Sequence, residues 1–249
     1  MLSTHYTPGA LCWLDLGTPD VPATVAHYEG LFGWTYQQAG DYGFFQSRGR
    51  TVAGLGLLTE PGARPAWMPY FQTTDAEATV KSVEQAGGTA RTPVMAAADV
   101  ARLAQLTDPA GAEFAIWEPG TTRGLDLVND PGSLGWAELY TPDIQAARAF
   151  YQSVFAWRVE EMPMGDQLYP VISPAEGDDA AMAGIVVDAG SRPHWLPYFE
   201  VADCDEVIAR SQASGGSVLV PVAEVDAIGR FATLTDPHGA HFAIITSTL

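Results

Sequence analysis

Hydrophobic and polar positions change period repeatedly along the chain. Residues 10–18, ALCWLDLGT, form a short apolar run typical of a strand. Between Asp20 and Gly33 the apolar residues recur at helical spacing, at Val21, Val25, Tyr28 and Phe32. Asp20 stands where a helix N-cap is expected, and Gly33 stands where the helix would end. Residues 42–47 and 51–59 then favour two strands with a turn between them.

A second cycle of the same kind begins with WMPYFQTT at 67–74, which has strand character. Residues 75–88 predict a capped helix ended by two glycines. The segment 103–117 predicts a hairpin, with the Pro and Gly of DPAG at turn positions. Each cycle is therefore a strand, a helix and three strands. Because Pro69 and Pro197 remove a ladder donor, their strands are predicted to be edge or irregular strands.

The whole pattern then occurs a second time. Trp13 matches Trp136 at an offset of 123 residues, and Trp67 matches Trp195 at an offset of 128. The second copy therefore holds about five extra residues, which we place around 165–180. We expect two domains at 8–120 and 135–249, joined by a linker at 121–134 that is rich in Gly, Pro and Asp.

Composition and charge limit the class of protein, its partners and its location. The 249 residues are 47% hydrophobic and 17% charged, as in a packed protein, and the formal net charge is −18. Such a charge disfavours nucleic acid and anionic membranes as partners. No secretory signal or membrane span is evident, and Cys12 and Cys204 make no disulfide framework. We expect a cytoplasmic protein, with a monomer favoured and a homodimer open.

Three motifs resemble the vicinal oxygen chelate superfamily, which includes glyoxalase I, bleomycin-resistance proteins and extradiol dioxygenases. They are TPD…Y…LFGW, YFQTTD…GG and TDPAGAEFAI with its twin TDPHGAHFAI, and they cover nearly the whole chain twice. The resemblance implies an α+β fold of four βαβββ modules, two in each of two glyoxalase-like domains. The curved mixed sheets of such a fold enclose a cavity, and the helices lie outside.

The resemblance also implies where a metal would bind, and this sequence departs from the family there. The aligned positions hold residues without a suitable donor for a hard or borderline cation, namely Trp13, Met68 and Ala115 in the first copy and Trp136, Leu196 and Ala243 in the second. The remaining position, near Leu55 or Ile185, has no carboxylate or imidazole nearby. We therefore expect neither a metal nor another cofactor.

Strand alternation predicts which side chains line the cavities instead. The candidate ligand-binding residues are Trp13, Trp67, Met68, Tyr70, Trp136, Tyr140, Trp195, Leu196, Tyr198, Glu200 and His241. Phe71 and Phe199 are expected under the helices. Two alternatives stay open: the first-strand tryptophans fill a closed core, and Trp67 and Trp195 are ordinary packing. Trp34 and Trp157 are expected in the core.

Asp15 and Glu138 are the candidate catalytic residues. A carboxylate that points into an apolar cavity has a raised pKa, which suits general acid or base chemistry. The alternative is a structural role common to both copies, because the two residues occupy the same repeat position. His241 is the candidate proton shuttle, His27 has an uncertain face, and His5 is placed in a loose terminus.

Three functions are compatible with these residues. The first is metal-independent binding of a hydrophobic or aromatic small molecule, such as an antibiotic or another secondary metabolite. The alternative is a metal-free tailoring enzyme of secondary metabolism that uses Asp15 or Glu138. A third is a metalloenzyme with displaced ligands drawn from Glu113, Glu200 or His241.

Overall fold

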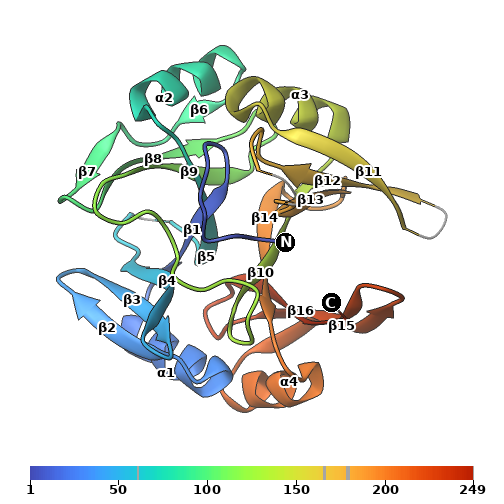
Figure 1. Cartoon of the computed structure of the whole chain (residues 1–249). Helices are drawn as coiled ribbons and strands as arrows, with labels where there is room; N and C mark the ends of the chain where they lie inside the picture. Colours follow the sequence, from blue (N-terminus) through green and yellow to red (C-terminus); the bar gives the residue numbers. More distant parts are fainter. Residues whose placement is uncertain (61, 165–166, 178–179, 249) are drawn as a thin grey trace. The chain divides into compact units, whose positions relative to one another are not determined.

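The computed structural model describes residues 1–60, 62–164, 167–177 and 180–248, which contain four helices and 17 strands (Figure 1). Part of the expected insertion at 165–180 lies outside the described residues, namely Gly165, Asp166, Asp178 and Asp179. The elements of the first copy are β1 (Leu11–Thr18), α1 (Val21–Phe32), β2 (Thr35–Ala39), β3 (Tyr42–Ser47), β4 (Arg50–Leu57), β5 (Ala66–Gln72), α2 (Ala76–Gln85), β6 (Thr89–Ala90), β7 (Met95–Ala97), β8 (Ala101–Thr107) and β9 (Glu113–Pro119).

The second copy repeats this order. Its elements are β10 (Ser133–Thr141), α3 (Ile144–Phe155), β11 (Arg158–Met164), β12 (Gln167–Ser173), β13 (Ala183–Val187), β14 (His194–Glu200), α4 (Cys204–Ala213), β15 (Ser217–Val225), β16 (Gly229–Thr235) and β17 (His241–Ser247). One mixed sheet has the strand order β2-β3-β4-β1-β5-β9-β8-β6, with β7 paired to β8. The other has the order β11-β12-β13-β10-β14-β17-β16-β15. The predicted α+β fold of tandem βαβββ modules is confirmed.

Each helix begins at an aspartate, as the sequence predicts for α1. The side chains of Asp20, Asp75, Asp143 and Asp203 accept hydrogen bonds from backbone N–H groups in the first turn. Helix α1 ends at Gly33, whose φ of 69° is in the left-handed region. The twin position at the end of α3 is Ala156, which adopts a φ of 54° without the freedom of glycine.

Two strands with a central proline occupy a different position from the one expected. The sequence predicts edge or irregular strands, but β5 lies between β1 and β9, and β14 lies between β10 and β17. The edge alternative is therefore wrong. The parallel ladders with β9 and β17 begin at Tyr70 and Tyr198, one residue after Pro69 and Pro197. The missing proline N–H thus lies outside these ladders.

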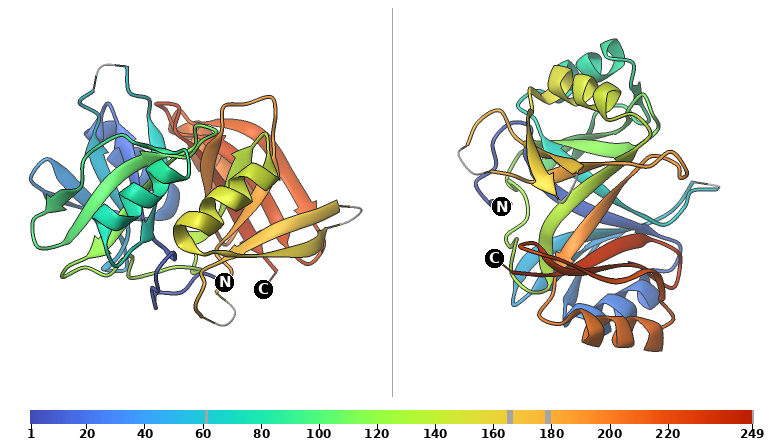
Figure 2. Two further views of the ribbon diagram at one scale, coloured as in Figure 1. Left: turned by 90° about the horizontal axis from the view of Figure 1, so that it is seen from above. Right: turned by 90° about the vertical axis from the view of Figure 1, so that its right-hand side faces the viewer.

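The chain divides into two compact units, and each unit takes residues from both sequence copies. The α2–α3 unit contains Met1–Trp13, Met68–Gly124 and Ala137–Trp195. The α1–α4 unit contains Leu14–Trp67, Leu125–Trp136 and Leu196–Leu249. Within each unit the two helices for which it is named lie against each other (Figures 1 and 2). Four of the five divisions fall inside strands β1, β5, β10 and β14, and the fifth falls between Gly124 and Leu125.

Tyr28 lies at the centre of the α1–α4 core and is completely buried. Its hydroxyl donates to Asp236 Oδ2 at 3.5 Å and accepts the indole N–H of Trp67 at 3.1 Å. Its ring stacks on Trp34 at a centroid distance of 5.7 Å. The remaining aromatic contacts of this core include Phe32, Phe45, Phe199 and Phe242. Phe199 therefore packs under the helices, as predicted.

The α2–α3 core repeats this arrangement around Tyr151. Its hydroxyl donates to Asp108 Oδ2 at 3.3 Å and accepts the indole N–H of Trp195 at 3.1 Å. Its ring stacks on Trp157 at 4.7 Å. Asp108 Oδ1 also accepts three backbone N–H groups of its turn, from Ala110, Gly111 and Ala112. Burial nevertheless raises the pKa of the Asp108 carboxyl.

Trp34 and Trp157 complete the two cores, as the sequence predicts. The indole of Trp34 donates to the carbonyl of Gly132 at 2.7 Å, and that of Trp157 donates to the carbonyl of Gly9 at 2.8 Å. These two glycines belong to matching Pro-Gly turns that precede β10 and β1. Among the described residues, no helix is long and apolar enough to cross a membrane. Both cysteines are buried and free.

Tyr151→Phe tests the hydrogen-bonded centre of the α2–α3 unit. We expect the free energy of unfolding to fall by about 1–3 kcal/mol, because the indole N–H of Trp195 loses its acceptor and Asp108 loses a donor. Tyr28→Phe is the matched change in the other unit. Tyr36→Phe on β2, a partly exposed tyrosine, is the control and should change stability by less than about 0.5 kcal/mol. Urea unfolding provides the measurement, and equal losses in all three variants would contradict the assignment.

Candidate functional site

Glu138 holds the more elaborate of two carboxylate–tyrosine clusters. It lies on β10, where Glu138 and Tyr140 are partly exposed and Ala137 and Leu139 are buried, so the predicted alternation of faces is confirmed. The hydroxyl of Tyr140 donates to Glu138 Oε2 at 2.9 Å, and that of Tyr169 donates to Oε1 at 2.7 Å. The ring of Tyr140 stacks on the His194 imidazole at 4.9 Å and 12°. All of these groups belong to the α2–α3 unit.

A glycine makes room for this cluster. Gly184 on β13 pairs with Glu138 in the parallel ladder. A Cβ atom at Gly184 would lie 1.8 Å from the hydroxyl oxygen of Tyr169. The tyrosine hydroxyl thus occupies the space beside the carboxylate that a side chain on β13 would otherwise fill.

The α1–α4 unit contains a simpler version of the cluster. The hydroxyl of Tyr42 donates to Asp15 Oδ2 at 3.2 Å. Gly54 pairs with Asp15 in the ladder between β1 and β4, and a Cβ atom there would lie 1.6 Å from the Tyr42 hydroxyl. Gly17 takes the place of Tyr140, so the donor that Tyr140 provides in the other cluster has no counterpart at this repeat position. Asp15 and Glu138 therefore share one arrangement, a carboxylate that accepts a tyrosine hydroxyl beside a ladder glycine.

Sequence reasoning found the carboxylates and Tyr140 but missed two further tyrosine partners, Tyr42 and Tyr169. The available signal was the pair of matching strands YGFFQS and QLYPVIS, each with one early tyrosine. A second signal was the glycine in AGLG and AGIV, directly after the alanine. Both signals are short, and only the register between strands shows that a hydroxyl lies over the glycine.

Trp13 is packed rather than open. It is 1% exposed and stacks on Trp117 at a centroid distance of 5.0 Å and 15°. Tyr70 packs edge-on against Trp117 at 6.0 Å. For Trp13, the alternative of a filled core is the arrangement observed. Sequence reasoning did not include Trp117 among the candidates, although strand alternation with Ala115 places it on the same face.

The matching residues of the second copy lie in the α1–α4 unit, and among them Trp136 is more exposed than its twin Trp13. Trp136 is partly exposed, whereas Leu196 and Tyr198 are buried. Tyr198 packs edge-on against Phe231 at 6.2 Å. Glu200 Oε1 accepts the backbone N–H of Ser247 at 3.0 Å. Burial raises the pKa of the Glu200 carboxyl, and the bond from Ser247 opposes this shift.

Trp67 and Trp195 pack in the cores of the two units. Both are buried, and each indole donates to the central tyrosine of its own unit. They share the helix-facing side of β5 and β14 with Phe71 and Phe199, since residues two apart on a strand face the same way. This is the packing arrangement that the sequence analysis leaves open as the alternative.

The metal positions of the family do not fit a cation here. The α2–α3 unit holds three of them, and they carry the stacked Trp13, the partly exposed Met68 and the buried Ala115. The α1–α4 unit holds their twins Trp136, Leu196 and Ala243. Indole, thioether, methyl and isobutyl groups provide no oxygen or imidazole ligand.

Displaced ligands do not form a cluster either. Among the described residues, the His, Cys, Asp and Glu groups whose ligand atoms lie within 4.8 Å of one another are Asp75, Glu77 and Glu118. Asp75 and Glu118 accept backbone N–H groups at the start of α2, and Glu77 and Glu118 pair with Arg102. Glu113 instead pairs with Arg91 at 2.7 Å and with Arg192 at 3.2 Å.

Two of the histidines singled out in the sequence differ in exposure. His241 is exposed at the start of β17. His27 is 2% exposed, with its Nδ1 2.7 Å from Ser214 Oγ, and its Nε2 has no hydrogen-bond partner among the described residues. Burial lowers the pKa of His27, although the negative charge of Asp236 opposes the shift. The twin position of His27 is Phe150.

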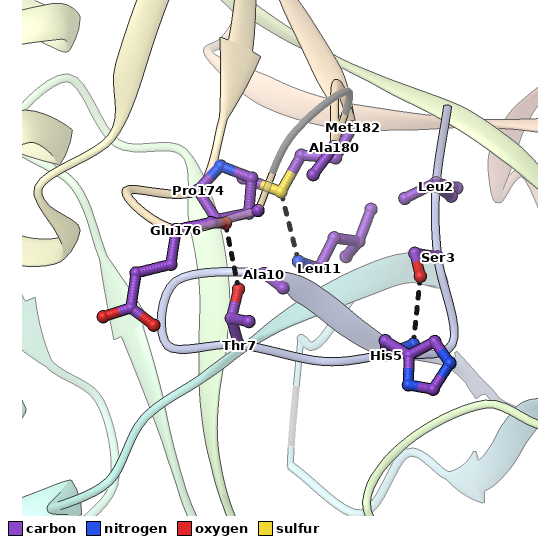
Figure 3. Close-up of a pocket in the computed structure, with 11 residues that line it drawn as sticks. Leu2, Ser3, His5, Thr7, Ala10, Leu11, Pro174, Glu176, Ala180 and Met182 are labelled. Atoms are coloured by element: carbon purple, nitrogen blue, oxygen red, sulfur yellow. Dashed lines mark hydrogen bonds between the residues drawn. The ribbon is translucent and has the colours of Figure 1, made fainter.

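The N-terminal segment is partly packed, although His5 itself is exposed. Leu2 is buried, and Ser3, His5 and Leu11 line a cavity of about 220 Å³ with residues that follow β12 (Figure 3). The Leu11 N–H approaches Met182 Sδ at 3.2 Å, and the Thr7 hydroxyl donates to the Glu176 carbonyl at 3.4 Å. The cavity is smaller than the roughly 300–1,000 Å³ typical of ligand pockets.

Tandem βαβββ modules with an altered metal position define a glyoxalase-like protein of the two-domain kind. The chain belongs to the Glyoxalase/Bleomycin resistance protein/Dioxygenase superfamily, whose profile matches residues 10–116 and 133–244. The resemblance predicted from the sequence is confirmed.

Individual relatives and structures agree with this assignment. The chain is 38% identical to the anthracycline biosynthesis protein DnrV of Streptomyces peucetius, over 97% of this chain and 94% of the relative. It is similar in fold to the Mn(II)-bound glyoxalase of Novosphingobium aromaticivorans, with a TM-score of 0.65, 16% identity, and coverage of 96% and 83% of the two chains. The 2,3-dioxygenase LapB of Pseudomonas sp. KL28 also gives a TM-score of 0.65, with 13% identity and coverage of 97% and 93%.

His27→Phe, which copies Phe150, tests the buried imidazole. Because the folded-state pKa of His27 is lowered, its stabilising effect is present above the unfolded pKa of about 6.5 and is lost as the pH falls towards the folded value. We expect the wild type to lose free energy of unfolding between about pH 7 and pH 5, and the variant to lose less. Urea unfolding at both pH values measures this. His5→Ala, an exposed control, should keep the wild-type slope, and an unchanged slope in His27→Phe would contradict the interpretation.

Proposed function

We propose that the protein binds a hydrophobic or aromatic small molecule of secondary metabolism, of the antibiotic kind, without a metal ion. The observation that carries the proposal is the replacement of the family's metal positions by Trp13, Met68 and Ala115 and by their twins. A site without cation ligands but with indole and phenol rings recognises its ligand by shape and stacking. The similarity to an anthracycline biosynthesis protein supports a planar, fused-ring ligand.

The net charge supports the proposed class of ligand and the proposed location. A net charge of −18 repels anions at long range, which favours a neutral or cationic guest over an anionic one. It also argues against nucleic acid and anionic membranes as partners. We further propose a cytoplasmic location and a monomer, because the duplication supplies both modules of each compact unit within one chain.

A metal-free tailoring enzyme is the second candidate, and the Glu138 cluster favours it. A carboxylate with two tyrosine O–H donors combines a base with adjacent acids, which is the combination that enolisation or cyclisation needs. Asp15, which accepts the Tyr42 hydroxyl, is the matching residue in the other unit. In this alternative Glu138 accepts a proton from the substrate, and a tyrosine hydroxyl donates to the oxygen that becomes negative.

Metal analysis and binding together test the first proposal. Protein purified without chelator should contain far less than one metal ion per chain by mass spectrometry. Planar anthraquinones should quench its tryptophan fluorescence equally well in the presence of EDTA or of added Mn²⁺. A stoichiometric ion, or binding that EDTA abolishes, would overturn metal independence. No quenching by any member of a broad aromatic panel would overturn the binding proposal itself.

Glu138→Gln tests the enzyme alternative. Metal-free protein is incubated with a panel of anthraquinone and anthracyclinone compounds, and products are followed by liquid chromatography and mass spectrometry. If Glu138 is the base, the variant should convert substrate about 10²–10⁴-fold more slowly with unchanged affinity. Asp15→Asn is the matched change in the other unit. Absence of turnover in the wild type, or full turnover in both variants, would exclude this chemistry.

A further inference from the structure

The connection between the last two strands of the first βαβββ module differs in length between the two copies. In the first copy, β3 and β4 are joined by the two-residue turn of Arg48 and Gly49, which both adopt a positive φ. In the second copy, residues 174–182 join β12 to β13, and the structure describes 174–177 and 180–182 of them. The short turn belongs to the α1–α4 unit, and the longer connection belongs to the α2–α3 unit.

In the α1–α4 unit, the linker before β10 packs directly beside the short turn. Thr51 and Asp126 exchange two hydrogen bonds at 2.9 Å, from the Thr51 N–H to the Asp126 carboxylate and from the Asp126 N–H to the Thr51 carbonyl. Arg50 forms an ion pair with Asp130 at 3.2 Å. The segment before β1 takes the equivalent place in the α2–α3 unit. There a cavity of about 220 Å³ lies between this segment and the longer connection (Figure 3).

The lining of this cavity is mainly apolar. Its buried residues are Leu2, Leu11, Pro174 and Met182, and Ala10 and Ala180 add their methyl groups. Ser3 Oγ accepts the His5 N–H at 3.0 Å, and the Thr7 hydroxyl donates to the Glu176 carbonyl. His5 and Glu176 are exposed, so their ionisable groups stay in water. A buried apolar end favours an uncharged ligand, because a charge is costly there.

Two contacts that cross the cavity are weak. The Leu11 N–H approaches the Met182 sulfur at 3.2 Å, and a thioether is a weak acceptor. The Thr7 hydroxyl lies 3.4 Å from the Glu176 carbonyl oxygen, beyond the usual O–H···O range of about 2.5–3.0 Å. A molecule in the cavity would touch both walls. It would therefore add apolar contact between the N-terminal segment and the connection.

We propose that this cavity binds a small uncharged molecule with a single ring, and that the bound ring holds the N-terminal segment against the β12–β13 connection. A dry apolar cavity of about 150 Å³ binds benzene, so 220 Å³ is enough for one ring. The volume is below the roughly 300–1,000 Å³ of sites for larger ligands. The fused-ring ligand of the proposed function therefore binds elsewhere, and the two sites are independent.

Calorimetric titration of the purified full chain with toluene tests the site. We expect one toluene per chain, with a Kd of about 1 mM or below. Ala10→Leu and Ala180→Leu fill the cavity from opposite walls, and each should weaken binding about tenfold or more. Thermal unfolding checks that the variants fold, and one folded variant is sufficient. Met95→Leu, at an exposed methionine of the same unit, is the control and should keep the wild-type affinity.

Hydrogen exchange of the wild type tests the effect on the N-terminal segment. Toluene at about ten times its Kd should slow amide exchange in residues 2–11 by about tenfold, because the ligand binds only the closed arrangement. Exchange in the twin segment, residues 125–134, should stay unchanged. Equal rates with and without toluene in residues 2–11, or equal slowing in both segments, would overturn the proposed effect.

Charged and larger analogues test the class of ligand. Benzoate and benzylamine should each bind at least about tenfold more weakly than toluene. Anthraquinone should not displace toluene. A charged analogue that binds as tightly as toluene would overturn the uncharged class. Displacement by anthraquinone, or wild-type toluene affinity in the cavity-filling variants, would place the ring in another site and overturn the assignment. No binding of toluene would overturn this inference alone, since the proposed function depends on the separate binding of anthraquinones.

Discussion

The fold depends on a hydrogen-bonded contact between residues that lie far apart in the sequence. In each compact unit a buried tyrosine hydroxyl joins a turn aspartate to a strand tryptophan: Tyr28 joins Asp236 to Trp67, and Tyr151 joins Asp108 to Trp195. The tyrosine and the aspartate always come from different sequence copies. An unsatisfied polar group at such a depth is costly, so each unit is well packed only when both copies contribute to it.

Because of this constraint, the two faces of the central strands have different roles. On the helix-facing side of β5 and β14, Trp67 and Trp195 are committed to the tyrosine centre together with Phe71 and Phe199. On the opposite side, side chains are free of this requirement and differ between the copies. Asp15 is replaced by Glu138, Gly17 by Tyr140, Gln72 by Glu200 and Trp117 by Ile245. The repeated phrases WMPYF and WLPYF therefore place shared packing residues on one face of β5 and β14, and the opposite face of each sheet carries the residues that differ between the copies.

Much of the fold follows from local signals in the sequence. The four capping aspartates, the glycine after α1 and the DPxG turns give the elements and their order, and the two offsets give the duplication. The sequence does not show that a module from one copy packs with a module from the other, because Tyr28 and Asp236 are separated by 208 residues. The prediction of edge strands from Pro69 and Pro197 fails for a related reason. A proline excludes a donor at one point of a ladder, and only the observed register shows that the ladder begins after it.

The site is less predictable than the fold because its chemistry depends on register between strands. Alternation alone identifies Glu138 and Tyr140 as neighbours on one face. It cannot show that Tyr169 lies over Gly184, since that contact needs three strands in alignment. The same limit applies to Trp13, which alternation assigns to the concave face without revealing that Trp117 covers it. Trp117 lies on β9, two strands from Trp13, and the two rings meet only because the sheet places them on one face. The position of Trp117 is Ile245 in the second copy, where a second indole is not available to fill the same space. The packing of a side chain at the family's metal position therefore depends on a residue that neither the local pattern nor the repeat connects with it.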